Sequence, residues 1–262
     1  MDLVAIMVVY KNGDWLKVGP YSFKEHYPDV PLILINNSVE SDTELLVKVA
    51  KDLNVEIVDN VEYNRSHGGG LACGVKIAKQ KKYRYMMIIE ADCLFFEGET
   101  NLKVSLKELK QSKAWVTYVL STVNGLPHPV GSVWDLKFID EKKDASSWEI
   151  QPKSAKERQE SGIVVKMTNP WFYSHFDPSH KLFWRAIRAG KCKIVQSKGG
   201  PGGKGLKHFY RNAKSRVYRT KDETPQRAIK RMERWRPEMY GILAKVKEHM
   251  EQNAVDHPKE KP

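Results

Sequence analysis

Four short apolar runs, separated by segments of helical periodicity, constrain the fold of this 262-residue chain more than any other feature. The runs are LVAIMVVY (3–10), PLILIN (31–36), VEIVDN (54–59) and YMMIIEA (85–91). Continuous apolar runs of this length are typical of parallel strands that are buried on both faces, and alternation with helices implies crossover connections. The sequence therefore predicts an α/β fold with a mostly parallel sheet flanked by helices.

Weaker signals predict the remaining elements. Helical periodicity follows the second run, and a glycine-led helix is predicted over residues 68–82. Further helices are predicted over residues 99–112 and 178–190. Strands are predicted over 114–121, 130–140, 162–168 and 191–196, and the glycine-rich stretch 197–208 is predicted to be a loop without regular structure.

Composition narrows the class of protein. Three scattered cysteines without a CxxC pair indicate neither a disulfide framework nor a zinc site, so we expect a reducing, cytoplasmic setting. No transmembrane segment is expected, because no run approaches about 20 apolar residues. The net charge of +12 is uneven: residues 181–262 hold 22 Lys and Arg against 8 Asp and Glu, whereas residues 1–180 hold 22 against 24. This asymmetry predicts a polyanionic partner such as nucleic acid, an anionic membrane or a charged glycan; a solvated basic helix is the structural alternative.

The basic segment 198–236 is the candidate for contact with such a partner. It holds 13 Lys and Arg against 3 acidic residues, with aromatic residues interleaved. Cations can bind phosphates and ring faces can stack on bases, so the nucleic-acid-binding candidates are Arg211, Lys214, Arg216 and Arg219. An anionic membrane surface would be bound by the same cations.

Two carboxylates, Glu90 and Asp92, end the fourth apolar run. Open parallel sheets bind ligands outside the carboxyl ends of their strands, and alternate residues of a strand point the same way. Hard oxygen ligands of this kind suit Mg²⁺ or Mn²⁺. The glycines at 68–70 do not complete a dinucleotide motif, because Cys73 stands where GxGxxG needs glycine. They indicate either close packing of a helix on the sheet or a backbone that approaches a diphosphate.

This order of strands, with a glycine-led helix and a strand ending in EADC, resembles the nucleotide-sugar-dependent glycosyltransferases of the GT-A fold, particularly the family 2-like group. The resemblance implies a Rossmann-like catalytic domain over residues 1–222. Its nucleotide-sugar-binding half is residues 1–112, its acceptor half is residues 113–222, and a basic helical extension follows over 223–262. It also implies a nucleotide-diphosphate sugar as donor, with a UDP-sugar as the first expectation, and Mn²⁺ or Mg²⁺ as the metal.

The resemblance also assigns expected roles to residues. Asp92 would bind the metal, Glu90 would lie near the metal or the ribose, and His208 could complete the metal shell. Contacts with the nucleotide sugar are expected from Val9, Tyr10, Asn36, Asn37, Asn64, Gly68, Glu90, Ala91, Lys204 and Lys207. Asp177 is the candidate general base or acceptor-binding acid. His175 and His180 are alternatives to it, although capping or packing would explain either histidine.

The expected activity is metal-dependent transfer of a sugar to an acceptor hydroxyl. Given the basic C-terminal third, the acceptor predicted first is a hydroxylated base in DNA, for example a hydroxymethylated one, as modified by viral enzymes in a host cytoplasm. One alternative is a membrane-peripheral transferase of surface polysaccharide or glycolipid synthesis. Another is a non-catalytic nucleic-acid-binding module, because the family's Asp-x-Asp is Glu-x-Asp here.

Overall fold

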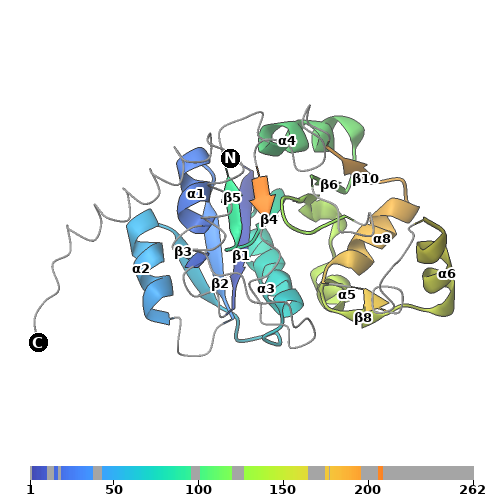
Figure 1. Ribbon diagram of the computed structural model, residues 1–262, viewed down its shortest axis with the longest axis horizontal. Helices are drawn as coiled ribbons and strands as arrows, with labels where there is room; N and C mark the ends of the chain where they lie inside the picture. Colours follow the sequence, from blue (N-terminus) through green and yellow to red (C-terminus); the bar gives the residue numbers. More distant parts are fainter. Residues whose placement is uncertain are drawn as a thin grey trace, which may run out of the picture.

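Strands and helices alternate along the first half of the chain, as the sequence predicts (Figure 1). The computed structural model describes residues 2–10, 15–16, 19–37, 43–95, 101–119, 127–164, 175–176, 178–195 and 206–208. The first elements are β1 (Leu3–Val9), α1 (Gly19–His26), β2 (Leu32–Asn36), α2 (Thr43–Leu53), β3 (Glu56–Asp59), α3 (His67–Gln80) and β4 (Tyr85–Ile89).

The second half contains shorter elements. They are β5 (Cys93–Phe95), α4 (Asn101–Ser112), β6 (Val116–Tyr118), β7 (Val133–Asp135), η3 (Leu136–Phe138), α5 (Glu141–Asp144), η4 (Ala145–Trp148), β8 (Gln151–Pro152), α6 (Ala155–Val164), β9 (His175–Phe176), α8 (His180–Arg188), β10 (Cys192–Ile194) and β11 (Leu206–His208). In the part of the chain that is described, no helix is both long and apolar enough to cross a membrane.

The central sheet has the strand order β10-β6-β7-β4-β1-β2-β3. Its pairs are parallel except at β7, which runs antiparallel to both β4 and β6. Two small antiparallel pairs, β5 with β11 and β8 with β9, lie outside this sheet. The predicted fold class, a mostly parallel sheet flanked by helices, is therefore confirmed.

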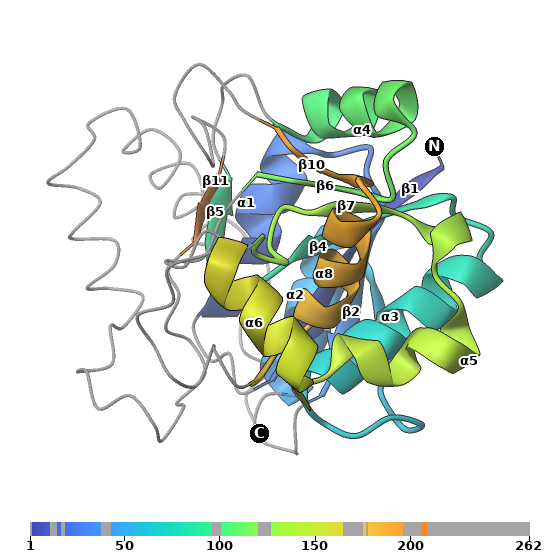
Figure 2. The same ribbon diagram turned by 90° about the vertical axis from the view of Figure 1, so that its right-hand side faces the viewer.

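Both faces of the sheet are buried, which explains the continuous apolar runs. Alternate β1 residues such as Ala5 and Met7 pack with α1, α2 and α4 in one core cluster. The residues between them, such as Val4 and Ile6, pack with α3 and α8 in the other. Figure 2 shows α3 and α8 on the same side of the sheet.

Three local predictions are corrected. Residues 162–164 were predicted as strand, but α6 remains helical through Val164. The stretch 197–208 was predicted to be irregular, but β11 occupies its last three residues. Helix α1 was not predicted. The predicted extension over 223–262 lies outside the described residues, and the domain limits stay predictions.

Candidate functional site

The carboxyl ends of β1 to β4 meet at one edge of the sheet. Val9 pairs with Asn36, Asn36 pairs with Asp59, and Met7 pairs with Ile89. Because these strands are parallel, the residues that follow them gather at the same edge. This edge is the candidate functional site.

Residues 90–93 form a turn at this edge rather than the last part of a strand. β4 ends at Ile89, and the Cys93 N–H donates to the Glu90 carbonyl at 3.2 Å. Strand alternation was expected to direct both carboxylates into one cleft. That argument does not apply, because residues in a turn do not alternate as they do in a strand. Asp92 is 2% exposed, whereas the Glu90 side chain is 20% exposed.

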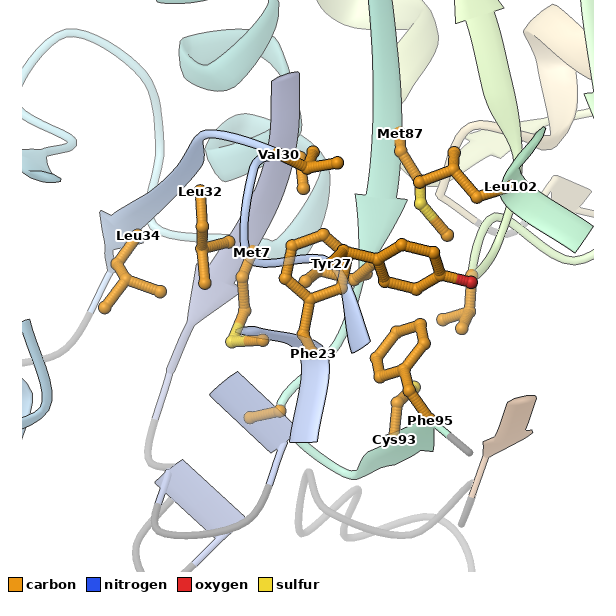
Figure 3. Packing of buried hydrophobic residues seen from close by; sticks show 14 of the residues in the cluster. Met7, Phe23, Tyr27, Val30, Leu32, Leu34, Met87, Cys93, Phe95 and Leu102 are labelled. Carbon is orange, nitrogen blue, oxygen red and sulfur yellow. The ribbon is translucent and has the colours of Figure 1, made fainter. Parts of the chain in front are cut away.

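Helix α1 holds the turn in place from one side. A Cβ added at Gly19 would lie 2.2 Å from the Ala91 carbonyl oxygen, so only glycine permits this approach. The buried Ser22 hydroxyl accepts from the Phe95 N–H at 2.7 Å and donates to the Phe95 carbonyl at 3.1 Å. Figure 3 shows the rings of Phe23 and Tyr27 packed against Phe95. Asp92 thus precedes a strand that α1 anchors.

The pairing of β5 with β11 brings the end of β11 to the same turn. His208 lies opposite Cys93 in the register, one residue along the chain from Asp92, and Lys207 lies opposite Leu94. The two strands lie side by side in Figure 2. The side chains of His208 and Lys207 are outside the described part, so their roles stay predictions.

Several other predicted site residues lie outside the described residues. They are Asp177, Lys204, Arg211, Lys214, Arg216 and Arg219. Their predicted roles as general base, phosphate ligand and nucleic-acid contacts stay predictions.

A buried amide network connects β2 with the start of α3. Asn37 is fully buried; its Nδ2 donates to the Ser66 carbonyl at 2.6 Å, and its Oδ1 accepts from Asn60 Nδ2 at 2.7 Å. Asn36, in contrast, is partly exposed and donates to the Asp59 carboxylate at 2.7 Å. The structure thus gives Asn37 a structural role at this edge, and the predicted nucleoside contacts of both asparagines stay predictions.

The glycines of α3 are required by close packing. A Cβ at Gly70 would lie 2.5 Å from Val8 Cγ1, and a Cβ at Gly68 would lie 2.4 Å from the Trp148 carbonyl oxygen. Ser66 caps the helix, because its Oγ accepts from the Gly69 N–H at 2.9 Å. Asn64 Nδ2 donates to the Glu149 carboxylate. The packing explanation of these glycines therefore has direct support.

The remaining predicted nucleotide contacts also lie at this edge. Val9, the last residue of β1, is fully buried, and Tyr10 directly after it is 38% exposed. Ala91 is buried in the turn that follows β4. Tyr10 therefore offers the accessible surface among these three positions.

The predicted acceptor half is continuous with this edge. The Gly131 N–H donates to the Ile88 carbonyl at 2.8 Å, so the segment leading into β7 lies beside the end of β4. The Ser179 N–H, at the start of α8, donates to the Trp148 carbonyl at 2.9 Å, the same oxygen that approaches Gly68. His175 lies opposite Pro152 in the β8–β9 pair.

Sequence reasoning missed three contributors to this edge. His67, the first residue of α3, places Nε2 3.5 Å from Glu90 Oε1. Gly19 and Ser22 hold the turn, as described above. In the sequence, His67 was marked only by its position ahead of the glycines. Gly19 and Ser22 were missed because α1 has no apolar periodicity that would have identified the helix.

The carboxylate groups of the turn at residues 90–93 are chemically suited to bind a hard divalent cation. Asp92 and Glu90 provide carboxylate oxygens, and Mg²⁺ is usually held by one or two carboxylates together with substrate phosphates. Among the described side chains, no group of three or more His, Cys, Asp or Glu residues could hold a metal ion. Any metal here would therefore need oxygen atoms from the substrate, or a ligand outside the described side chains.

Comparison with solved structures finds proteins of similar fold at low identity. The chain is similar to S. aureus TarS (residues 1–349) in complex with UDP-GlcNAc, with a TM-score of 0.47 and 10% identity over 74% of this chain and 56% of that one. It is similar to the galactosyltransferase LgtC in complex with donor and acceptor sugar analogs. The TM-score is 0.43 and the identity is 12%, over 74% of this chain and 73% of that one. It is also similar to the mannosyltransferase PcManGT from Pyrobaculum calidifontis in complex with GDP-Man and Mn²⁺. The TM-score is 0.41 and the identity is 14%, over 51% of this chain and 44% of that one.

Four TarS structures are longer than the region matched, which spans 49%, 36%, 56% and 64% of their chains. No protein-family model matches the sequence, and no curated protein matches it.

Proposed function

We propose that this protein is a glycosyltransferase that moves a sugar from a nucleotide-diphosphate donor to an acceptor hydroxyl. The observation that carries the proposal is the turn at residues 90–93. It sets an acidic residue, Asp92, at the carboxyl edge of a parallel sheet, between an anchoring helix and the end of β11. Ligand sites of open α/β sheets lie at this edge.

The proposed mechanism uses the two sides of the edge differently. Asp92 and Glu90, with His208 of β11, would hold Mn²⁺ or Mg²⁺, which supplies positive charge to the leaving diphosphate when bound. His67 contacts Glu90 and would fix the direction of its carboxylate. Tyr10, exposed beside β1, offers a ring face to the nucleobase, and the acceptor hydroxyl would approach from the side of residues 127–130 and α8.

The acceptor that charge favours is a polyanion. With net +14 over residues 181–262, we propose DNA that carries a hydroxymethylated base, with Arg211, Lys214, Arg216 and Arg219 on its phosphates. A base inside a duplex would have to be flipped out to reach the edge. An anionic membrane glycan is the second candidate, supported by the same charge.

Donor hydrolysis tests the enzyme class. We expect the full chain to hydrolyse a nucleotide sugar, with UDP-sugars assayed first, only when Mn²⁺ or Mg²⁺ is present. Asp92→Asn should lose at least a hundredfold of this activity while keeping its thermal unfolding transition, whereas Asp29→Ala at an exposed position should keep full activity. Activity that is unchanged in Asp92→Asn would contradict the proposed site.

Acceptor identity needs a separate measurement. Duplex and single-stranded DNA with 5-hydroxymethylcytosine should gain a sugar mass by mass spectrometry, while matched DNA with 5-methylcytosine should not. Transfer to anionic lipid-linked glycans instead would favour the second candidate. Metal-dependent binding of DNA without turnover of any donor would favour a non-catalytic module.

A further inference from the structure

One row of side chains on α8 contains two buried polar nitrogen atoms that have no hydrogen-bond partner among the described residues. His180, Trp184 and Arg188 are spaced by four residues and therefore share one face of the helix. His180 is 3% exposed and Trp184 is 2% exposed. Arg188 reaches Glu157 and Glu160 at 3.6 Å each, so this face of α8 lies against α6.

His180 offers a lone pair. Its Nε2 is buried and has no partner in the part of the chain that the structure describes, so the hydrogen bond to the Pro127 carbonyl comes from Nδ1. Burial, with a smaller contribution from the nearby Lys153, lowers the pKa of His180 to about 4, and the hydrogen bond to Pro127 acts in the opposite direction. The ring is therefore neutral at physiological pH, with its proton on Nδ1 and an acceptor at Nε2.

Trp184 offers the complementary group. Its indole Nε1 is also buried without a partner, and an indole nitrogen can only donate. A buried polar group without a partner costs about 1–3 kcal/mol, so two on adjacent helical turns require an explanation. A hydroxyl group matches both at once, because it donates one hydrogen bond and accepts others.

The pair lies on the acceptor side of the candidate site. Pro127, which binds His180, directly precedes the segment that meets the end of β4 through Gly131. Ser179, the residue before His180, is bonded to Trp148, which packs against the start of α3. A group held by His180 and Trp184 would therefore lie between the edge of the sheet and α6.

We propose that His180 and Trp184 bind a hydroxyl group of the acceptor, which donates to His180 Nε2 and accepts from the indole N–H of Trp184. The inference rests on the proposed function and specifies its acceptor: a neutral, hydroxyl-bearing group enters this position. Because a base of such low pKa takes up protons poorly near neutral pH, His180 positions the hydroxyl and does not deprotonate it.

Lys153 is a charged group that acts on His180 electrostatically. It is 2% exposed, and burial lowers its pKa to about 8, with Glu157 acting in the opposite direction. Its ammonium is thus predominantly charged at neutral pH and favours the oxygen of a hydroxyl over a second cation. This charge also opposes protonation of His180, which keeps Nε2 as an acceptor.

Nuclear magnetic resonance of the full chain tests binding without relying on activity. The indole resonance of Trp184, assigned by its absence in Trp184→Phe, is followed during addition of two matched pairs of probes. The pairs are 5-hydroxymethyl- and 5-methyl-2′-deoxycytidine, and methyl β-D-glucopyranoside and its fully O-methylated ether. We expect a saturable shift with at least one hydroxylated member, none with its partner, and none in His180→Phe.

The resonance of Trp115 is the internal control. Trp115 stacks on Phe138 at the opposite edge of the sheet and should not move. If neither hydroxylated probe shifts Trp184, or if Trp115 shifts equally, the proposal is wrong and a buried water explains the pair.

Kinetics separates this inference from the proposed function. Trp184→Phe keeps a ring and removes only the N–H, so the KM for a hydroxylated acceptor should rise several-fold, and by more than the KM for the nucleotide-sugar donor. If the unmodified chain showed no donor hydrolysis, that result would contradict the proposed function instead. Normal donor hydrolysis with an unchanged acceptor KM in both Trp184→Phe and His180→Phe would overturn the inference alone.

Discussion

A single hydroxyl connects the candidate site to the core. Ser22 of α1 is fully buried, and its Oγ bonds both backbone groups of Phe95, three residues after Asp92. The rings of Phe23 and Phe95 lie 5.2 Å apart beside this contact. The position of the turn at residues 90–93 therefore depends on a residue that binds no substrate.

Ser22→Ala should destabilise the protein, because it leaves the buried N–H and C=O of Phe95 without the Ser22 hydroxyl. We expect the free energy of unfolding to fall by about 1–3 kcal/mol in urea denaturation. The matched control is Ser105→Ala, since Ser105 is equally buried but its Oγ has no hydrogen-bond partner among the residues that are described. A loss in the control as large as that in Ser22→Ala would show that the two hydrogen bonds are not the cause.

At the scale of elements, an ion pair fixes α8 against α5. Arg185 donates from both terminal nitrogens to Asp144, at 2.6 and 2.9 Å, and Asp144 is 2% exposed. This pairing raises the pKa of Arg185. Since Ser179 and His180 begin α8, the pair also sets the position of the proposed acceptor side.

Arg185→Met should leave the Asp144 carboxylate buried with its main cation removed. We expect a loss of about 2–3 kcal/mol in the free energy of unfolding, measured by denaturation. Arg188→Met on the same helix is the control: its side chain is 44% exposed, against 43% for Arg185, but its ion pairs are 3.6 Å long. The control should lose less than about 1 kcal/mol, and equal losses would contradict the argument.

The sequence predicted those elements whose pattern follows from burial alone. β1, β2 and β4 are buried on both faces, so their apolar runs are continuous and easily identified. α1 was missed because it opens with Gly19 and Pro20 and is stabilised by tertiary packing of Phe23, not by periodicity. β11 was missed because a three-residue strand depends on its partner β5.

The candidate site was predictable to a similar degree. The location of Asp92 follows from the end of an apolar run. The pairing of the next residues with β11 could not be predicted from the sequence. The turn at residues 90–93 was read as strand because its hydrogen bond leaves no sequence pattern. The His180–Trp184 pair was not identified, because i, i+4 spacing on an amphipathic helix is equally typical of core packing.

At the scale of the whole molecule, the buried histidine makes stability depend on pH. The folded pKa of His180 is about 4 against an ordinary value of 6.5, so between these values the unfolded chain binds a proton that the folded chain does not. Stability is therefore unaffected by this group above pH 6.5 and falls as the pH decreases toward 4. The loss amounts to roughly 3 kcal/mol.

His180→Phe should flatten this part of the profile. The variant loses the bond to Pro127 and is expected to be less stable at pH 7, but its free energy of unfolding should decline less between pH 6.5 and 4. Denaturation at closely spaced pH values measures the difference. Parallel profiles for both proteins would show that His180 does not titrate as described.

The uneven charge of the whole chain predicts how the proposed binding of DNA would respond to salt. The 22 cations of residues 181–262 would release counterions from the phosphates, so the logarithm of affinity should fall linearly with the logarithm of salt concentration. Reversing Arg211, Arg216 and Arg219 to Glu should reduce that slope by roughly 3, about one for each phosphate contact removed. The control reverses three exposed lysines, Lys48, Lys103 and Lys107, and changes the net charge equally. Direct contacts with phosphates, and not the net charge, set this slope, so the control variant should retain the slope of the unmodified protein. Equal reductions of the slope in both variants would show that the charge acts only at long range.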